Sequence, residues 1–277
     1  MKIKLLIVQL EAVAGDIDKN ILKIRELLDK SNHSCSDLIV LPELWTIGWD
    51  SPNFNKSSEH IFESRAYKFL KEIAIKYNSN VIGGSAVLKK EGEKDRNTCL
   101  IFNRQGELIS SYDKFHLFSH RGQSEGSFLE EGETPVIVKT DIGKIGISIC
   151  YDIRFPEMFR LYAFNDVDIM VNMAAWPKAF ADDYVTLAKA RAIENQTIFI
   201  SSCLTGKINE SFDFSGQSMA IDYKGKIINK LDEEEDVLYA ELDTEEMHQY
   251  RKQMPILKDT KRSYQILEKW WKTYLKF

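Results

Sequence analysis

Three side chains of complementary chemistry stand at the ends of predicted strands. Glu43 follows the apolar run 38–41, Cys150 closes the apolar run 145–150, and Lys114 directly follows a third predicted strand. In open α/β sheets, ligands gather beyond the carboxyl ends of the strands, so these side chains can meet at one edge. Together a thiol, a carboxylate and an ammonium can supply a nucleophile, a base and a group that stabilises developing negative charge. The three residues are therefore candidates for cysteine-based catalysis.

Each of these residues also has an ordinary structural explanation when it is taken alone. Free cysteine is among the most buried residue types and usually fills apolar space. Glu43 could cap a turn at the sheet rim, and Lys114 could be a surface lysine with a buried stem. Cys150 precedes Pro156, the predicted first turn of a helix, whose amide groups would lower the pKa of a nearby thiol. Taken together, the three positions favour the catalytic interpretation.

The elements that must position these side chains alternate between strand and helix, which predicts an α/β fold. Predicted strands span 3–10, 38–41, 80–88, 97–103, 107–113, 135–140, 145–150, 167–174, 197–204, 217–230 and 237–242. Predicted helices follow Asp16 and Asp18, cover 58–77, begin at Pro156, and cover 182–195 and 244–253. The polar segment 115–134 is predicted to be a loop, and a loop of that length in a compact domain tends to be functional. With no long linker, we expect one domain, 1–277, whose tail 255–277 is a candidate for packing on a partner subunit.

Composition excludes several classes of protein. The 277 residues carry 37 Lys and Arg against 42 Asp and Glu, a net charge of −5, with no dense basic stripe that would predict nucleic-acid binding. Hydrophobic residues make up 44%, too many for a disordered chain. No apolar run approaches the roughly 20 residues of a membrane-spanning helix. The four cysteines, Cys35, Cys99, Cys150 and Cys203, form no CxxC pair, which is typical of reduced thiols in a cytoplasmic protein.

No metal site is predicted from the histidines. His116 and His120 are four residues apart, but their segment is predicted to be a strand end and loop, with no acidic residue at metal-ligand spacing. Asp152, Arg154 and Glu157 are interpreted as a structural charge network around the turn after the candidate nucleophile.

Four sequence blocks resemble the nitrilase superfamily of carbon–nitrogen hydrolases. They are Leu41-Pro42-Glu43, Tyr112-Asp113-Lys114-Phe115-His116-Leu117-Phe118, Cys150-Tyr151-Asp152-Ile153-Arg154-Phe155-Pro156-Glu157 and Ala188-Lys189-Ala190-Arg191-Ala192-Ile193-Glu194-Asn195-Gln196. Their order and spacing agree with the family over essentially the whole chain. The resemblance implies a four-layer αββα sandwich, a homodimer, and hydrolysis without a metal or an organic cofactor.

The resemblance also implies catalytic roles. It assigns Glu43 as general base, Lys114 as the partner of the oxyanion and Cys150 as nucleophile. A second glutamate is expected in the long loop, a few residues before a Pro-Gly pair. Here Glu131-Gly132 stands in place of that pair. Counting back from the glycine gives Glu125, with Glu130 and Glu131 as alternatives.

Within the superfamily, the third block and Ala175-Trp176-Pro177 resemble the ω-amidase-like branch. That resemblance implies a cysteine-dependent amidase that hydrolyses the terminal amide of small 2-oxo or dicarboxylic acid amides, such as 2-oxoglutaramate, through a thioester. Tyr151, Trp176 and Arg154 are the expected substrate-binding residues. Arg121, Arg154 and Lys178 are candidates to bind the substrate carboxylate.

The same residues also fit two other functions. The same three catalytic residues could act on another substrate, such as an N-carbamoyl amine, an aliphatic amide or a nitrile. The second alternative is a non-catalytic interaction protein on the same scaffold. It is disfavoured because all three chemical roles are filled.

Overall fold

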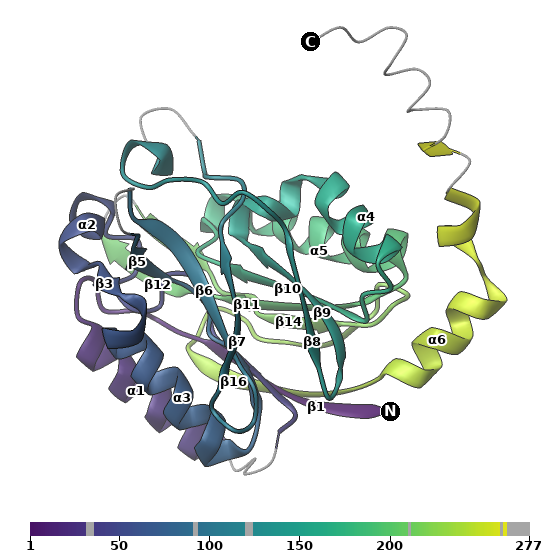
Figure 1. Cartoon of the computed structure of the whole chain (residues 1–277), viewed down its shortest axis with the longest axis horizontal. Helices are drawn as coiled ribbons and strands as arrows, with labels where there is room; N and C mark the ends of the chain where they lie inside the picture. Colours follow the sequence, from purple (N-terminus) through teal and green to yellow (C-terminus); the bar gives the residue numbers. More distant parts are fainter. Residues whose placement is uncertain (32–35, 91–93, 120–123, 210–211, 261–262, 265–277) are drawn as a thin grey trace, which may run out of the picture.

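The chain folds into two β-sheets that pack face to face, with helices on both outer faces, in a computed structural model (Figure 1). The structure describes residues 1–31, 36–90, 94–119, 124–209, 212–260 and 263–264. This arrangement is the predicted four-layer αββα sandwich, and the prediction of the fold is confirmed.

The first sheet has the strand order β16-β1-β2-β4-β6-β5-β3, and β7 pairs with β6. Its strands are β1 (Lys2–Gln9), β2 (Leu38–Val40), β3 (Glu59–His60), β4 (Asn80–Ile82), β5 (Ala86–Lys89), β6 (Arg96–Phe102), β7 (Leu108–Asp113) and β16 (Asp236–Asp243). Strands β1, β2 and β4 run parallel, so their carboxyl ends lie at the same edge.

The second sheet has the order β15-β14-β11-β10-β9-β8. Its strands are β8 (Val136–Thr140), β9 (Gly143–Ile149), β10 (Ile169–Ala174), β11 (Ile198–Cys203), β14 (Met219–Ile221) and β15 (Ile227–Lys230). Its central strands β9, β10 and β11 also run parallel. A separate hairpin consists of β12 (Thr205–Asn209) and β13 (Phe212–Ser215).

Helices cover the outer faces of the two sheets, and Figure 1 shows α1 and α3 on the side opposite to α4 and α5. The helices are α1 (Ile17–Lys30), α2 (Phe54–Ser57), α3 (Arg65–Tyr77), α4 (Pro156–Phe164), α5 (Ala181–Asn195) and α6 (Thr244–Gln253). Short 3₁₀ turns are η1 (Ser51–Asn53), η2 (Ile61–Glu63), η3 (Glu125–Ser127), η4 (Cys150–Arg154) and η5 (Lys178–Phe180).

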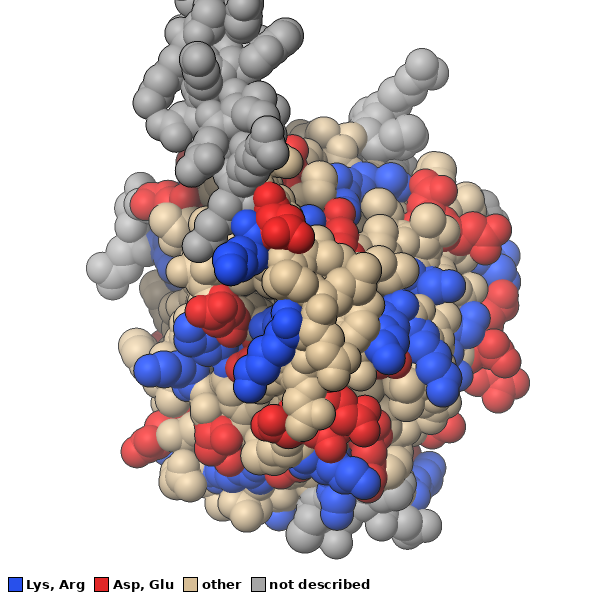
Figure 2. All heavy atoms as spheres, turned by 90° about the vertical axis from the view of Figure 1, so that its right-hand side faces the viewer, with Lys and Arg blue, Asp and Glu red and all other residues tan. Residues whose placement is uncertain are grey.

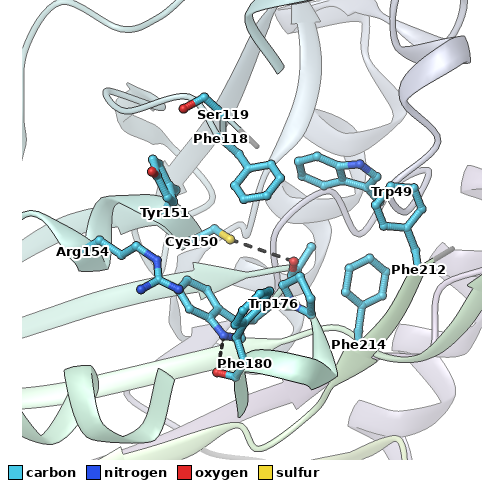
Figure 3. Close-up of a pocket in the computed structure, with 12 residues that line it drawn as sticks. Trp49, Phe118, Ser119, Cys150, Tyr151, Arg154, Trp176, Phe180, Phe212 and Phe214 are labelled. Carbon is cyan, nitrogen blue, oxygen red and sulfur yellow. Dashed lines mark hydrogen bonds between the residues drawn. The ribbon is translucent and has the colours of Figure 1, made fainter. Parts of the chain in front are cut away.

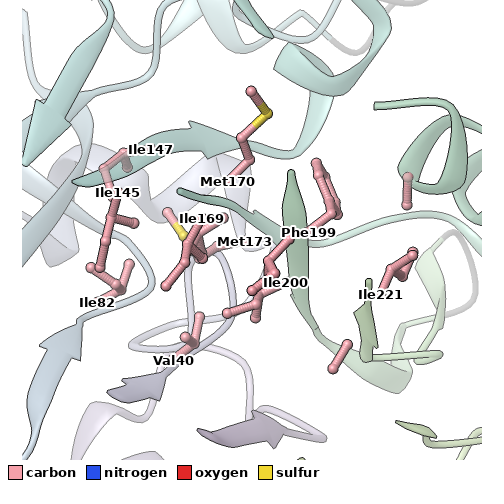
Figure 4. Packing of buried hydrophobic residues seen from close by; sticks show 14 of the residues in the cluster. Val40, Ile82, Ile145, Ile147, Ile169, Met170, Met173, Phe199, Ile200 and Ile221 are labelled. Atoms are coloured by element: carbon pink, nitrogen blue, oxygen red, sulfur yellow. The ribbon is translucent and has the colours of Figure 1, made fainter. Parts of the chain in front are cut away.

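The side-chain alternation of a strand explains the layers. In β1, Ile3, Leu5 and Ile7 enter the core between the two sheets, whereas Leu6 and Val8 enter the core under α1 and α3. A strand that is buried on both faces has a nearly continuous apolar sequence, as β1 has. Figure 4 shows part of the core between the sheets, where Val40 and Ile82 lie opposite residues of β9 and β10.

Capping residues account for where the helices begin. Asp16 accepts a hydrogen bond from the Lys19 amide and caps α1, as its position predicts. The predicted helix over 58–77 was too long. Ser64 caps α3 through the Tyr67 amide, and the preceding residues form β3 and a 3₁₀ turn instead.

The predicted strand over 80–88 is two strands, β4 and β5, separated by Gly83, Gly84 and Ser85. Gly84 has a φ of +60°, and a Cβ there would lie 2.1 Å from the Pro42 carbonyl oxygen. This bend packs directly against the segment that carries Glu43. The hairpin of β12 and β13 was not predicted.

Within the described ranges, no helix combines the length and the apolar character that crossing a bilayer requires. The face shown in Figure 2 carries acidic and basic side chains interspersed with one another, unlike the single-sign surface typical of nucleic-acid binding. Most of the predicted C-terminal tail, including 265–277, lies outside the described residues.

Candidate active site

Four of the predicted site residues meet at the carboxyl ends of the strands. Glu43 lies three residues beyond β2, and Lys114 directly follows β7. Glu125 begins η3 within the long loop, and Cys150 begins η4 directly after β9. Their exposed fractions are 0% for Glu43 and Lys114, 1% for Glu125 and 5% for Cys150.

Lys114 joins the two glutamates. Its Nζ lies 2.8 Å from Glu43 Oε1 and 2.7 Å from Glu125 Oε2. Asn97 Nδ2 donates to the same two carboxylates, at 3.0 Å to Glu43 Oε1 and 3.1 Å to Glu125 Oε1. Buried charges need such partners because desolvation is costly. The cluster therefore holds both glutamates in fixed positions around one ammonium group.

Glu125 is the loop glutamate that reaches this cluster. The Phe118 amide donates a hydrogen bond to Glu125 Oε2 at 2.6 Å, which ties the loop back to the end of β7. The alternatives Glu130 and Glu131 are both exposed. Of the three glutamates considered from the sequence, Glu125 is the one beside Lys114.

The peptide groups of Ala175 connect Glu43 with Cys150. The Ala175 amide donates to Glu43 Oε2 at 2.7 Å, and Cys150 Sγ lies 4.0 Å from the Ala175 carbonyl oxygen. Ala175 directly follows β10, which lies beside β9 in the sheet. Thus the thiol and the carboxylate border the same residue, although they are 107 positions apart in the sequence, from 43 to 150.

Burial raises the pKa of the Cys150 thiol well above its usual range, and the nearby Glu43 carboxylate raises it further. The sequence-based prediction that a helix N-terminus lowers this pKa was therefore wrong. The physical reason is desolvation, which disfavours the thiolate and outweighs the attraction of Lys114. The raised pKa favours the protonated thiol, so a nucleophilic role requires a base beside it.

The charge of Lys114 is secure in this environment. Burial by itself would lower the pKa of the ammonium group, but the carboxylates of Glu125 and Glu43 outweigh burial and raise it. Burial raises the pKa of Glu125, against the opposing effect of Lys114. Lys114 is thus suited to stabilise negative charge and unsuited to accept a proton.

The backbone at Cys150 adopts a strained conformation, and hydrogen bonds from α5 hold the turn η4 that begins there. Cys150 has a φ of +49°, in the left-handed region that non-glycine residues rarely adopt. Arg191 of α5 donates two hydrogen bonds to the Ile153 carbonyl oxygen in η4, at 3.0 and 2.8 Å. Strain of this kind persists only where neighbouring structure enforces it, and it clusters at functional sites.

Asp152 links two segments of the site, the turn that begins at Cys150 and the end of β7, which Lys114 follows. It is fully buried, and its Oδ2 accepts hydrogen bonds from Tyr112 Oη at 2.6 Å and the Ile149 amide at 2.8 Å. Its Oδ1 accepts from the His116 amide at 2.9 Å and contacts His116 Nδ1 at 2.8 Å. The structural role predicted for Asp152 is confirmed, and His116 serves this network.

A cavity of about 370 Å³ opens beside Cys150 (Figure 3). All three residues predicted to bind substrate, Tyr151, Arg154 and Trp176, line it. The Arg154 guanidinium lies 4.8 Å from the centroid of the Trp176 ring and 3.4 Å from Asp183. Arg154 therefore contributes to the cavity, and among the described residues its ion-pair partner is Asp183, in an exposed pair.

The other two candidates to bind the substrate carboxylate are Lys178 and Arg121. Lys178 lies outside the cavity lining and pairs with Glu233 at the surface, at 2.5 Å. Arg121 and His120 lie outside the described residues, as does Cys35. The described cysteines, Cys99, Cys150 and Cys203, are free thiols.

Sequence reasoning missed Asn97 and most of the aromatic lining. Asn97 lies between Arg96 and Thr98 in the polar first half of β6, so its sequence context carries no signal of a site. The cavity lining also includes Trp49, Phe212 and Phe214. Phe212 and Phe214 belong to the hairpin that was not predicted, so no sequence argument connected them with the site.

Comparison with known proteins assigns the chain to one family. The model of the family "Carbon-nitrogen hydrolase" matches residues 4–252 of the chain. The chain belongs to the carbon–nitrogen hydrolase family. It is thus a hydrolase that acts on carbon–nitrogen bonds, within the nitrilase superfamily.

Curated relatives and a solved structure are similar to this carbon–nitrogen hydrolase over nearly its whole length. The "Hydrolase in agr operon" of Staphylococcus aureus is 33% identical, covering 93% of this chain and 98% of the relative. The "2-oxoglutaramate amidase" of Bacillus subtilis is 32% identical, covering 95% and 99%. The crystal structure of Saccharomyces cerevisiae Nit3, a member of branch 10 of the nitrilase superfamily, aligns with a TM-score of 0.81 at 30% identity, covering 92% of this chain and 94% of Nit3.

Proposed function

We propose that this hydrolase is an amidase that converts the terminal amide of small 2-oxo or dicarboxylic acid amides into acid and ammonia. The observation that carries the proposal is the Lys114 ammonium held between two buried carboxylates, with the Cys150 thiol close by and Arg154 in the adjoining cavity. The similarity to a 2-oxoglutaramate amidase supports the same substrate class.

The first half-reaction forms a thioester. Glu43 accepts the proton of the Cys150 thiol while the sulfur attacks the amide carbon. Negative charge grows on the carbonyl oxygen, where Lys114 and the Tyr151 backbone N–H stabilise it, and one such donor contributes about 2.7–4 kcal/mol to transition-state stabilisation. Glu43 then passes its proton to the nitrogen, the carbon–nitrogen bond breaks, and ammonia leaves.

The second half-reaction releases the acid. Water attacks the thioester carbon and gives a proton to Glu43, and the carbon–sulfur bond breaks as that proton returns to the sulfur. Splitting a difficult substitution into two acyl transfers is the general benefit of nucleophilic catalysis. Glu125 keeps Lys114 aligned in both steps through its 2.7 Å contact. Each step is proton transfer or addition and elimination at a carbonyl, so the mechanism calls for no cofactor.

Arg154 is the proposed binding group for the substrate carboxylate. It is the charged residue among the described residues that line the cavity. Its side chain is 35% exposed and its partner Asp183 is 54% exposed, so the ion pair between them contributes little to stability. A substrate carboxylate can therefore replace Asp183 at low cost, and a guanidinium suits bidentate binding of a carboxylate. The Trp176 ring packs against the Arg154 guanidinium.

The test is ammonia release from a substrate panel, with Cys150→Ala as blank. The panel contains 2-oxoglutaramate, 2-oxosuccinamate, a neutral aliphatic amide, an N-carbamoyl amine and a nitrile. We expect the acid amides to give the highest kcat/KM, and Arg154→Met to raise their KM without raising that of the neutral amide. A preference for the carbamoyl amine or the nitrile, lost in Cys150→Ala, would instead support the alternative substrates for the same residues.

We also propose that the enzyme is a cytoplasmic homodimer. The mechanism needs a reduced thiol, and the described cysteines are free. Leu161 and Phe164 on α4 and Ile193 on α5 expose 46%, 37% and 48% of their surface, and the two helices pack against each other. A second copy is the proposed cover for this apolar surface. Sedimentation equilibrium should give twice the chain mass, and Leu161→Glu should shift the equilibrium to monomer.

A further inference from the structure

One side of the cavity is a wall of aromatic rings. The aromatic wall consists of Trp49, Phe118, Phe212 and Phe214, which come from the segment after β2, the loop after β7 and the hairpin strand β13. Trp49 lies 6.0 Å from Phe118 and 6.0 Å from Phe212, and Phe212 lies 6.4 Å from Phe214, between ring centroids. The rings therefore form one continuous apolar surface.

The aromatic wall and the cation lie on different sides of the nucleophile. Figure 3 shows Cys150 between Arg154 on one side and Trp49, Phe212 and Phe214 on the other. A short 2-oxo acid amide uses the cation and the thiol, and its polar chain gains little from four aromatic rings. The volume of about 370 Å³ is in the range of cavities that enclose drug-sized ligands. The cavity thus has apolar space that the smallest proposed substrates leave unfilled.

The amide nitrogen is an unsuitable place for a group that would fill this space. During the reaction the nitrogen must face Glu43, which donates its proton. Both oxygens of Glu43 are already hydrogen-bonded, and Lys114 and Glu125 beside it are 0% and 1% exposed. This end of the site accommodates an unsubstituted amide. An apolar group must therefore belong to the acyl part of the substrate.

We infer that the preferred substrates are primary amides whose acyl chain carries both a carboxylate and an aromatic side group. The inference rests on the proposed function and specifies its substrate class. The carboxylate binds Arg154, the amide carbon faces Cys150, and the aromatic group packs against the aromatic wall. Aromatic side chains gain from tilted and edge-to-face ring contacts in addition to the area they bury.

The experiment compares glutaramate with 3-phenylglutaramate, which differ by one phenyl group, by ammonia release. The wild-type enzyme should give a kcat/KM at least tenfold higher for 3-phenylglutaramate. Phe212→Ala removes one partly exposed ring of the wall and should lower this ratio to about one third or less, whereas Phe212→Trp should retain most of it. Phe62→Ala is the matched control, because Phe62 is 70% exposed and outside the cavity lining, and it should leave the ratio unchanged.

The outcomes separate this inference from the proposed function. Turnover of glutaramate equal to or faster than that of 3-phenylglutaramate overturns the inference and leaves the amidase proposal standing. An unchanged ratio in Phe212→Ala also overturns it. Faster release of benzylamine from N-benzylglutaramate than of ammonia from 3-phenylglutaramate would assign the wall to the leaving group and overturn it as well. If neither glutaramate releases more ammonia than the Cys150→Ala blank does while 2-oxoglutaramate does, the inference fails and the amidase proposal stands. If 2-oxoglutaramate releases no more ammonia than the blank either, both proposals fail.

Discussion

Replacing Asp152 with Asn should loosen the turn that carries Cys150 without altering the shape of the side chain. Each oxygen of Asp152 accepts a hydrogen bond from a backbone amide, that of Ile149 at Oδ2 and that of His116 at Oδ1. Asparagine has only one oxygen. Whichever way its amide is turned, its NH₂ group faces a backbone N–H that can only donate: that of Ile149, which is buried, or that of His116, which is partly buried.

This mismatch sets the expected loss in the free energy of unfolding. A buried donor that loses its acceptor costs about 1–3 kcal/mol, and the remaining bonds lose the strengthening given by a charged acceptor, at about 1 kcal/mol in total. We therefore expect a loss of about 2–4 kcal/mol in the free energy of unfolding. For a chain of this size that corresponds to a fall in Tm of roughly 3–7 °C.

Urea unfolding followed by tryptophan fluorescence measures the loss, and steady-state ammonia release measures the effect on activity. Because Asp152 does not line the cavity, kcat should fall by about 10²-fold through misplacement of the thiol, with little change in KM. Asp18→Asn is the matched control, since Asp18 is 73% exposed and should change stability by less than about 0.5 kcal/mol. A loss below 0.5 kcal/mol in Asp152→Asn, or a change confined to KM, would refute this explanation of the turn.

Three further substitutions test the remaining parts of the site. Glu43→Gln removes the proton acceptor and should lower kcat/KM by about 10²–10⁴-fold. The residual rate should rise with pH up to pH 9, because burial, the largest cause of the raised thiol pKa, persists in this variant and only the thiolate then reacts; a flat pH–rate profile would contradict this. Lys114→Met should lower kcat/KM by about 10²–10³-fold, because it removes an oxyanion donor. It should also lower the free energy of unfolding by about 3–5 kcal/mol, because it leaves two buried carboxylates unpaired. In denaturant titrations Lys114→Met/Glu125→Gln should recover part of the stability but no activity. Gly84→Ala should destabilise the protein by at least about 1 kcal/mol in the same titrations, because its φ is +60° and the new Cβ meets the Pro42 carbonyl, and an unchanged midpoint would show that the bend is not needed.

The sequence allowed much of the fold and part of the site to be predicted. Glu43, Lys114 and Cys150 could be identified because parallel strands end at a common edge and strand ends are visible as apolar runs followed by polar residues. Glu125 was found by counting from Gly132, and its burial beside Lys114 agrees with that choice. The layers themselves came from the resemblance, since periodicity does not reveal which sheets face each other.

Other features depended on tertiary structure and were not visible in the sequence. Asn97 stands between Arg96 and Thr98 at the polar start of β6, and only the approach of Glu43 and Glu125 gives it a role. The pKa of Cys150 depends on burial, which local sequence does not report, so the helix N-terminus was given too much weight. Phe212 reaches the cavity through a hairpin that lies outside both sheets.

The measurement closest to the central claim is mass spectrometry of the enzyme quenched with acid during turnover of 2-oxoglutaramate. The proposed mechanism predicts an acyl group on the peptide that contains Cys150, released by hydroxylamine, together with a burst of one ammonia per active site where thioester hydrolysis is slow. Turnover that proceeds in Cys150→Ala, or an acyl group found on another residue, would contradict it.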